Sequence, residues 1–175
     1  MKIQLKLFLT IGFIFATTFS FAQEKFENEK LALVYDIFHN TTRENIISYM
    51  EKKHFDTDKT EKANYLKLGV PIEEELLFSI YLEDINEFEK IEILYGEDNK
   101  IMEVTYDFYG ASGINPIEKE LKDKKYKSKV DEFKILGSTV THLMWSKSRK
   151  KLNTFRTYSD SSNNVGELTY GIIEF

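Results

Sequence analysis

The chain contains no cysteine among its 175 residues, and only two prolines, eight glycines and one tryptophan. Without cysteine it has no disulfides, no thiolate ligand for zinc, no thiolate nucleophile and no lipid-modified N-terminal cysteine. Few prolines and glycines exclude a collagen-like or low-complexity chain. Aromatic residues make up 14% of the sequence, too many for a disordered chain that is 30% charged. The composition therefore predicts a globular protein whose core stabilises it without covalent cross-links.

The N-terminus has the pattern of an export signal. Lys2 and Lys6 give it a positive start, residues 7–16 form an apolar run, and serine and alanine follow within residues 20–22. This run is shorter than the roughly 20 apolar residues that span a bilayer. We expect residues 1–22 to be a cleaved signal peptide, which places the protein in the periplasm or outside the cell. The alternative is an uncleaved leader that anchors the chain in the membrane.

Charge is distributed unevenly along the chain. The net charge of the whole sequence is −5, but residues 23–112 carry 10 basic and 21 acidic residues, whereas residues 113–175 carry 12 and 8. The negative total argues against nucleic acid as a partner, because binding to phosphates needs a basic excess. The basic residues of the second part cluster at 119–129 and 147–151. They could attract the acidic first part or steer a partner protein.

Helical signals occur at the start of both parts. In the first part, apolar residues recur at helical spacing over 24–38, and a Thr-x-x-Glu capping box at Thr41 predicts a second helix that ends near His54. In the second part, Asn115-Pro116-Ile117-Glu118 is a further helix start, with asparagine as the predicted cap. Each helical stretch precedes segments of alternating apolar and polar residues, which predict strands.

The predicted strands form one antiparallel meander in each part, after an expected polar loop at 56–62. The strand ranges are 65–68, 77–82, 91–95 and 101–108 in the first part, and 133–137, 139–146, 152–158 and 167–175 in the second. Glu103-Val104-Thr105-Tyr106 matches Glu167-Leu168-Thr169-Tyr170 at an offset of 64, and Leu68-Gly69 matches Leu136-Gly137 at an offset of 68. These ordered matches favour an internal repeat. The alternative is one α+β domain that happens to alternate.

A helical element followed by a four-stranded meander, present twice in a small exported chain, resembles the tandem-repeat β-lactamase-inhibitor proteins and related bacterial envelope modules. The resemblance covers residues 41–175, rests on the order of the elements and includes no family-specific motif. It implies a concave sheet that faces a partner. We expect an α+β fold in which an acidic unit (23–112) and a basic unit (113–175) share one sheet, with helices packed on one face.

Patterns typical of catalysis or cofactor binding are absent from the sequence. His39, His54 and His142 lack the spacing of a metal site, and the chain has neither a nucleophile elbow nor a glycine-rich phosphate loop. We expect no catalytic residue, no metal and no cofactor. A hydrolase is an alternative only if His142 meets a carboxylate and a hydroxyl in the fold.

Aromatic residues on strands are the candidate binding residues, because the strands carry more of them than one small sheet would bury and because Tyr and Trp anchor many interfaces. The candidate partner-binding residues are Tyr81, Tyr95, Trp145 and Tyr158 on the strands and Lys147, Arg149 and Lys150 in a basic turn. The expected function is non-catalytic binding of another envelope or extracellular protein, as an inhibitor or immunity protein would do. The alternative is a periplasmic carrier whose helices close over a small apolar ligand.

Overall fold

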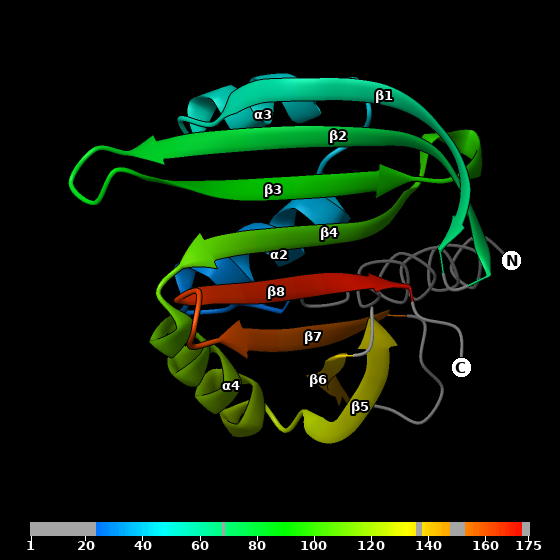
Figure 1. Ribbon diagram of the computed structural model, residues 1–175. Helices are drawn as coiled ribbons and strands as arrows, with labels where there is room; N and C mark the ends of the chain where they lie inside the picture. The colour runs from blue at the N-terminus through cyan, green and yellow to red at the C-terminus, as the bar shows by residue number, and fades with distance from the viewer. Residues whose placement is uncertain (1–23, 68, 136–137, 148–152, 173–175) are drawn as a thin grey trace, which may run out of the picture.

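The computed structural model describes residues 24–67, 69–135, 138–147 and 153–172, with side chains undescribed at 133–135 and 138–139. One antiparallel sheet of eight strands runs through it in the order β1-β2-β3-β4-β8-β7-β6-β5 (Figure 1). The strands are β1 (Asp56–Lys67), β2 (Val70–Leu82), β3 (Glu87–Tyr95), β4 (Ile101–Tyr109), β5 (Lys127–Ile135), β6 (Ser138–Ser146), β7 (Asn153–Asp160) and β8 (Val165–Ile172). The helices are α2 (Glu29–Asn40), α3 (Ile46–Lys52) and α4 (Ile114–Asp123), and the short 3-10 turns are η1 (Glu97–Asn99) and η2 (Ala111–Gly113). The predicted α+β fold with an antiparallel sheet is confirmed.

The two meanders meet at the centre of the sheet, where β4 pairs with β8. Thr105 lies directly opposite Thr169 in this pair, and Asp107 lies opposite Glu167. The hydroxyl oxygens of the two threonines are 3.2 Å apart. Because β4 and β8 are each the last strand of their meander, the strand order reverses at this seam, and residues 103–106 and 167–170 become neighbours.

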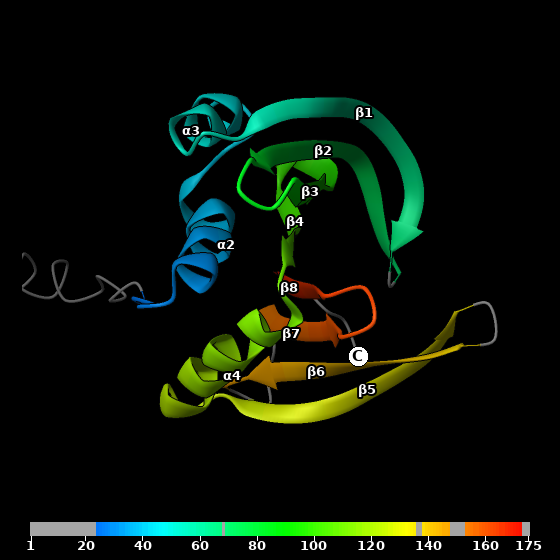
Figure 2. The same cartoon turned by 60° about the vertical axis from the view of Figure 1, so that its left-hand side comes forward.

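Helices α2, α3 and α4 lie on the same side of the sheet (Figure 2). Their buried residues recur three or four positions apart, as a single apolar helix face requires; they are Leu31, Val34 and Ile37 in α2, Ile46 and Met50 in α3, and Ile114, Ile117 and Leu121 in α4. The sheet residues of the same core include Phe78, Ile91, Ile93, Val104, Phe108, Phe155 and Leu168. Full burial of each such side chain contributes about 1.5–3 kcal/mol. The side of the sheet on which the three helices pack is called the covered face.

The first helix begins five residues later than its sequence pattern predicts. The side chain of Asn28 caps α2 by accepting hydrogen bonds from the backbone N–H groups of Lys30 and Leu31, at 3.0 and 3.2 Å. The residues before α2 contact α4 in the second part of the chain. There the Glu120 carboxylate accepts hydrogen bonds from the backbone N–H groups of Glu27 and Asn28, both at 2.7 Å. An extended segment thus replaces the predicted first turn.

Both predicted helix caps are wrong. The Thr41 hydroxyl donates to the carbonyl of Ile37 at 2.6 Å, so it closes the end of α2, and α3 begins only at Ile46. Asn115 lies inside α4, which begins at Ile114 and has no side-chain cap hydrogen bond. Each motif contains residues that favour several positions near a helix end, so the spacing alone did not fix which end they occupy.

The predicted polar loop at 56–62 is also wrong, because these residues form the first half of β1. As an edge strand that is exposed along most of its length, β1 needs no apolar alternation. Its pairing with β2 shifts register between Thr57 and Lys59 and again between Lys62 and Tyr65. Such irregularities bend a strand. Figure 2 shows the far ends of β1, β2, β5 and β6 curving away from the helices.

A contact between distant strands gives the same curvature independently. The ammonium of Lys67 on β1 lies 2.7 Å from the Glu103 carboxylate on β4. Three strand spacings separate β1 from β4, about 14 Å in a flat sheet, and side chains stand roughly perpendicular to a sheet, so these two side chains meet because the strands curve toward each other. The sheet is therefore concave on the side opposite the helices, and this side is called the open face.

Several predictions made from the sequence lie outside the described residues. They are the leader at 1–22, the basic residues Arg149 and Lys150, and the Leu68 and Leu136-Gly137 parts of the proposed repeat match. Within the described ranges, no helix has the length and hydropathy that a membrane crossing needs.

Candidate functional site

The predicted aromatic patch does not form as expected, because Tyr95 and Trp145 are both 0% exposed. Alternation places Tyr95 on the covered face together with Ile93. Trp145 is paired with Phe155 in the same core, and its indole N–H donates to the Thr157 hydroxyl at 2.9 Å. Neither side chain can contact a partner, so these two partner-binding predictions are wrong. The helices cover more aromatic surface than the sequence suggested.

The other predicted binding residues in the described part of the chain differ in exposure and in their contacts. Tyr81 is 45% exposed, and Tyr158 is half-buried beside His142, with their ring centroids 5.0 Å apart. The Lys147 ammonium pairs with the Glu24 carboxylate and lies 4.9 Å from the centroid of the Tyr126 ring. Lys147 therefore holds the N-terminal segment against the second part of the chain and is not a free cation for a partner.

Three exposed aromatic side chains lie on the open face at one end of the sheet. Tyr81 on β2 is paired with Phe88 on β3, and their ring centroids are 4.9 Å apart. Tyr109 on β4 shares this face, because Lys90 pairs with Asp107 in antiparallel register, Phe88 lies two residues before Lys90 and Tyr109 lies two residues after Asp107. Phe88 is 55% exposed and Tyr109 is 39% exposed. Tyr81, Phe88 and Tyr109 are called the aromatic row.

The sequence contained a signal for Phe88 and Tyr109. Both have the same strand parity as Glu92 and Asp107, the polar side of the predicted alternation. An aromatic residue at a polar position of an alternating strand is expected on the less covered face. Selecting aromatics by type alone found Tyr81 and missed the other two.

Carboxylates occupy the open face beside the aromatic row. Glu92, Asp107 and Glu167 are half-buried, and none forms an ion pair with a described residue. Burial, followed by the charge of Glu167, raises the pKa of Asp107 to about 6. Burial also raises the pKa of Glu92 and of Glu167 above the ordinary range. These three residues, called the carboxylate belt, are negative at neutral pH at a cost in desolvation.

Glu103 differs from the belt, because two cations compensate its charge. Its side chain is 5% exposed, and the carboxylate lies 2.7 Å from the Lys67 ammonium and 2.6 Å from the Arg156 guanidinium. The Thr105 and Thr169 hydroxyls meet beside it at the seam. This network joins β1, β4 and β7 and fixes the curvature of the open face.

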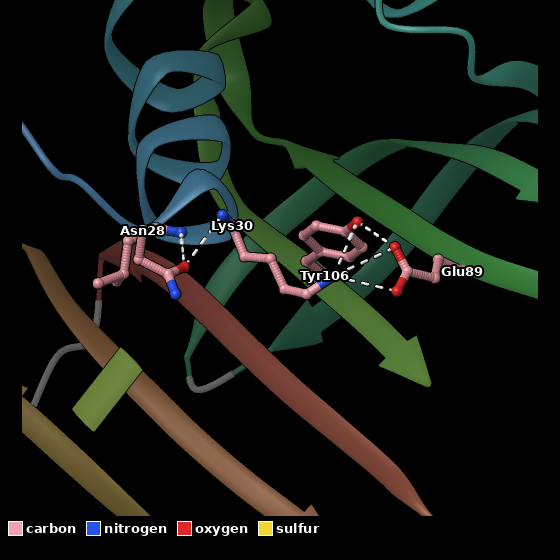
Figure 3. A network of polar contacts seen from close by, with 5 residues as sticks. Asn28, Lys30, Glu89 and Tyr106 are labelled. Carbon is pink, nitrogen blue, oxygen red and sulfur yellow. Dashed lines mark hydrogen bonds and ion pairs between the residues drawn. The ribbon is translucent and has the colours of Figure 1, made fainter. Parts of the chain in front are cut away.

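A second concave region lies on the helix side, where a groove of about 990 Å3 follows α2. Its floor holds an ion pair that Figure 3 shows between the helix and the sheet. The Lys30 ammonium is 3.0 Å from the Glu89 carboxylate and 3.4 Å from the Tyr106 hydroxyl, which itself donates to Glu89. The same ammonium lies 4.7 and 4.6 Å from the ring centroids of Tyr106 and Phe108.

Every charge in this network has a partner within it. Burial and the neighbouring Glu89 carboxylate raise the pKa of Tyr106, so the phenol stays protonated and keeps donating. Glu89 receives both the ammonium and the phenol, and Lys30 adds contacts with two aromatic faces. The network anchors α2 to β3 and β4 and leaves no activated group for chemistry.

The histidines show no arrangement typical of a metal or catalytic site. His39 Nε2 is 3.1 Å from the Tyr170 hydroxyl, and His54 is exposed at a left-handed backbone position with φ of 67°. His142 is 6% exposed opposite Asp131, and burial together with the Arg156 charge lowers its pKa. Among the residues that the structure describes, no group of three or more His, Asp or Glu side chains could hold a metal ion.

The open face is the candidate binding surface, because it combines exposed aromatic side chains with half-buried carboxylates that form no close ion pair with a described residue. The covered face is packed, and Lys30, Glu89 and Tyr106 at its groove are bonded to each other. Comparison of the chain with models of known families, with curated proteins and with solved structures finds no match.

Proposed function

We propose that this chain is a non-catalytic binding protein that engages another exported protein through the open face of its sheet. The aromatic row carries the proposal. Isolated exposed aromatics are common on protein surfaces, but Tyr81, Phe88 and Tyr109 occupy adjacent strands on one face. Tyr and Phe bury much area with few rotatable bonds, which suits an interface anchor.

The carboxylate belt supports the same surface. Glu92, Asp107 and Glu167 form no close ion pair with a described residue, and burial raises their pKa values despite the charges of Lys67, Lys90 and Arg156, so their negative charges cost folding free energy. A partner that places a lysine or arginine beside the belt would offset this cost on binding. Residues that lower stability without serving the fold are frequently kept for function.

Export and internal duplication are further parts of the proposal. The leader pattern of residues 1–22 supports export to the periplasm or beyond. The pairing of Thr105 with Thr169 supports duplication, because equivalent residues of two repeats meet in this way at an approximate twofold axis. Such a chain would be built like the tandem-repeat β-lactamase-inhibitor proteins, and an inhibitor or immunity role is one version of the proposed binding.

The test is affinity capture from an envelope extract with the tagged chain, followed by identification of the bound proteins. The variant Phe88→Ala/Tyr109→Ala removes two anchors of the open face. The control Ile47→Ala/Val130→Ala removes two side chains of comparable exposure, 37% and 54%, one on α3 and one at a covered-face position of the edge strand β5. We expect the wild type and the control to retain the same protein and the open-face variant to lose it. Equal capture by all three chains would reject the open face.

The groove supports a second candidate function, that of a carrier for a small ligand. Its volume of about 990 Å3 lies within the range of ligand pockets, and Phe26, Leu33, Tyr35 and Tyr49 contribute apolar surface. Native mass spectrometry of the protein purified from its own host tests this candidate. A bound species of a few hundred daltons would support the carrier, and a bare protein mass would count against it.

A further inference from the structure

The hairpin between β2 and β3 ends in a tip that projects at the left of Figure 1. Its turn comprises residues 83–86, and Tyr81 and Phe88 lie at the strand ends on either side. Ile85 within the turn is 44% exposed, beside Tyr81 at 45% and Phe88 at 55%. Three large apolar side chains thus gather at the most protruding part of this hairpin.

The tip is organised before any partner arrives. The Tyr81 hydroxyl donates to the Asn86 side-chain oxygen at 2.6 Å, which ties one strand end to the turn. Asn86 has φ of 57°, a left-handed conformation that asparagine tolerates better than most residues. The Tyr81 and Phe88 rings contact each other across the hairpin. These contacts hold the two rings and the turn together, which lowers the entropy cost of ordering them on binding.

Acidic residues surround the apolar centre of the tip. Glu83, Asp84 and Glu87 are all exposed, and none of them forms an ion pair with any described residue. Two other acids on the same two strands do form ion pairs, Glu74 with Arg43 and Glu89 with Lys30. The tip therefore presents three uncompensated negative charges around an apolar centre.

We propose that this hairpin tip docks into an apolar pocket rimmed by lysine or arginine on the partner protein. The inference rests on the proposed function and names the chemistry of the partner. Ile85 would enter the pocket, with the Tyr81 and Phe88 rings as its flanks. Glu83, Asp84 and Glu87 would meet the basic rim. This charge complementarity would speed the encounter and favour a basic pocket over an acidic or neutral one. Large side chains that fill a pocket at the centre of an interface commonly carry much of the binding energy.

Two other occupants fit the tip less well. An anionic membrane surface would repel three carboxylates. A second copy of the chain offers the helix-side groove as a pocket, but four acidic residues (Glu24, Glu29, Asp36 and Glu89) and three lysines line it, so it has no basic excess. A partner with a basic rim is the occupant that the charges favour.

Site-specific photocrosslinking in the producing cells tests the proposal on the full chain. Replacing Ile85 with p-benzoylphenylalanine probes the tip, and replacing Tyr109 probes the aromatic row away from the turn. We expect both probes to crosslink to one protein, and peptide mapping to place the Ile85 crosslink in an apolar site with lysine or arginine around it.

The remaining outcomes overturn the proposal in distinguishable ways. A protein crosslink from position 109 with none from position 85 would reject the tip and leave open-face binding intact. A crosslink from position 85 to lipid, to a second copy of the chain, or to a site without a basic excess would also reject it. No protein crosslink from either position would remove the proposed function as well.

Charge reversal tests the role of the acidic surround with the purified crosslinked partner. The variant is Glu83→Lys/Asp84→Lys/Glu87→Lys, and the matched control Glu51→Lys/Glu73→Lys/Glu97→Lys changes three exposed acids elsewhere. We expect the tip variant to lower the association rate constant about tenfold or more at low salt, and the control to change it less than about twofold. Equal rates for the two variants would overturn the steering role of the tip.

Discussion

The two faces of the sheet are made from the same strands but follow different rules. On the covered face, residues such as Tyr95, Trp145 and Phe155 are fully buried under the helices, and the buried charge of Glu89 has a cation. On the open face, Asp107 stays half-buried and forms no close ion pair with a described residue, and Phe88 is more than half exposed. The difference shows that the face on which a side chain lies sets its surroundings: helices cover one face of the central strands, and exposed aromatic side chains gather at one end of the other.

The largest predicted effect tests the covered face at its biggest side chain. Replacing Trp145 with alanine removes a fully buried indole and leaves the Thr157 hydroxyl without its donor. We expect a loss of about 3–5 kcal/mol in the free energy of unfolding, measured by urea denaturation. Tyr158→Ala on the open face is the control and should cost much less. Similar losses for the two variants would contradict the assignment of the faces.

The next effect tests the ion pair beneath α2. The variant Lys30→Met leaves the Glu89 carboxylate, which is 10% exposed, without its cation. Because Lys30 itself is partly exposed, we expect a loss of about 1–3 kcal/mol in unfolding free energy. The double variant Lys30→Met/Glu89→Gln should recover part of this loss, since it removes both charges. A double variant that loses the sum of the single losses would show that the two residues act independently.

A smaller effect, of opposite sign, tests the carboxylate belt. The folded-state pKa of Asp107 is about 6, above its ordinary value of 3.8, so stability should fall as the pH rises between these values. Asp107→Asn removes this cost and should stabilise the protein by roughly 1–2 kcal/mol at pH 7, with the pKa shift discounted for partial exposure. The gain should shrink toward zero as the pH falls below the ordinary pKa of 3.8, where the side chain becomes protonated in both states. Urea denaturation at a series of pH values measures it, and a gain independent of pH would contradict the assignment.

The smallest effect on stability belongs to the aromatic row. Phe88→Ala/Tyr109→Ala removes side chains that are 55% and 39% exposed, so each substitution should change the free energy of unfolding by less than about 1 kcal/mol. Thermal unfolding of the variant checks this expectation. A large destabilisation would mean that the row packs the fold, and a loss of capture by that variant would not then identify a binding surface.

Strand alternation was the most reliable guide in the sequence. Alternation over residues 101–108 predicts Met102, Val104, Tyr106 and Phe108 on one side and Glu103, Thr105 and Asp107 on the other, and the structure places Val104, Tyr106 and Phe108 together in the core. At Met102 a register shift between β3 and β4 interrupts the pattern. Local irregularities of this kind depend on the neighbouring strand, so one strand's own sequence does not reveal them.

The candidate site was less predictable than the fold. Tyr95 and Trp145 were expected to be exposed because the count of aromatics exceeded what a small sheet alone would bury. The segment before α2 adds Phe26, whose ring lies 5.4 Å from that of Phe155, and thereby enlarges the core. This contact joins residues far apart in the chain, and sequence periodicity carries no information about such contacts.

By itself, the sequence determined the α+β class, the antiparallel strands and the polar and apolar sides of the central ones, because these follow from local periodicity and chain composition. Tertiary structure decided which side of each strand the helices cover, which carboxylates receive cations and how the sheet curves. Glu103 and Asp107 show the reason, since they lie four residues apart on one strand face. Only the arrival of Lys67 and Arg156 from distant strands makes the first a structural anchor and leaves the second as part of the carboxylate belt.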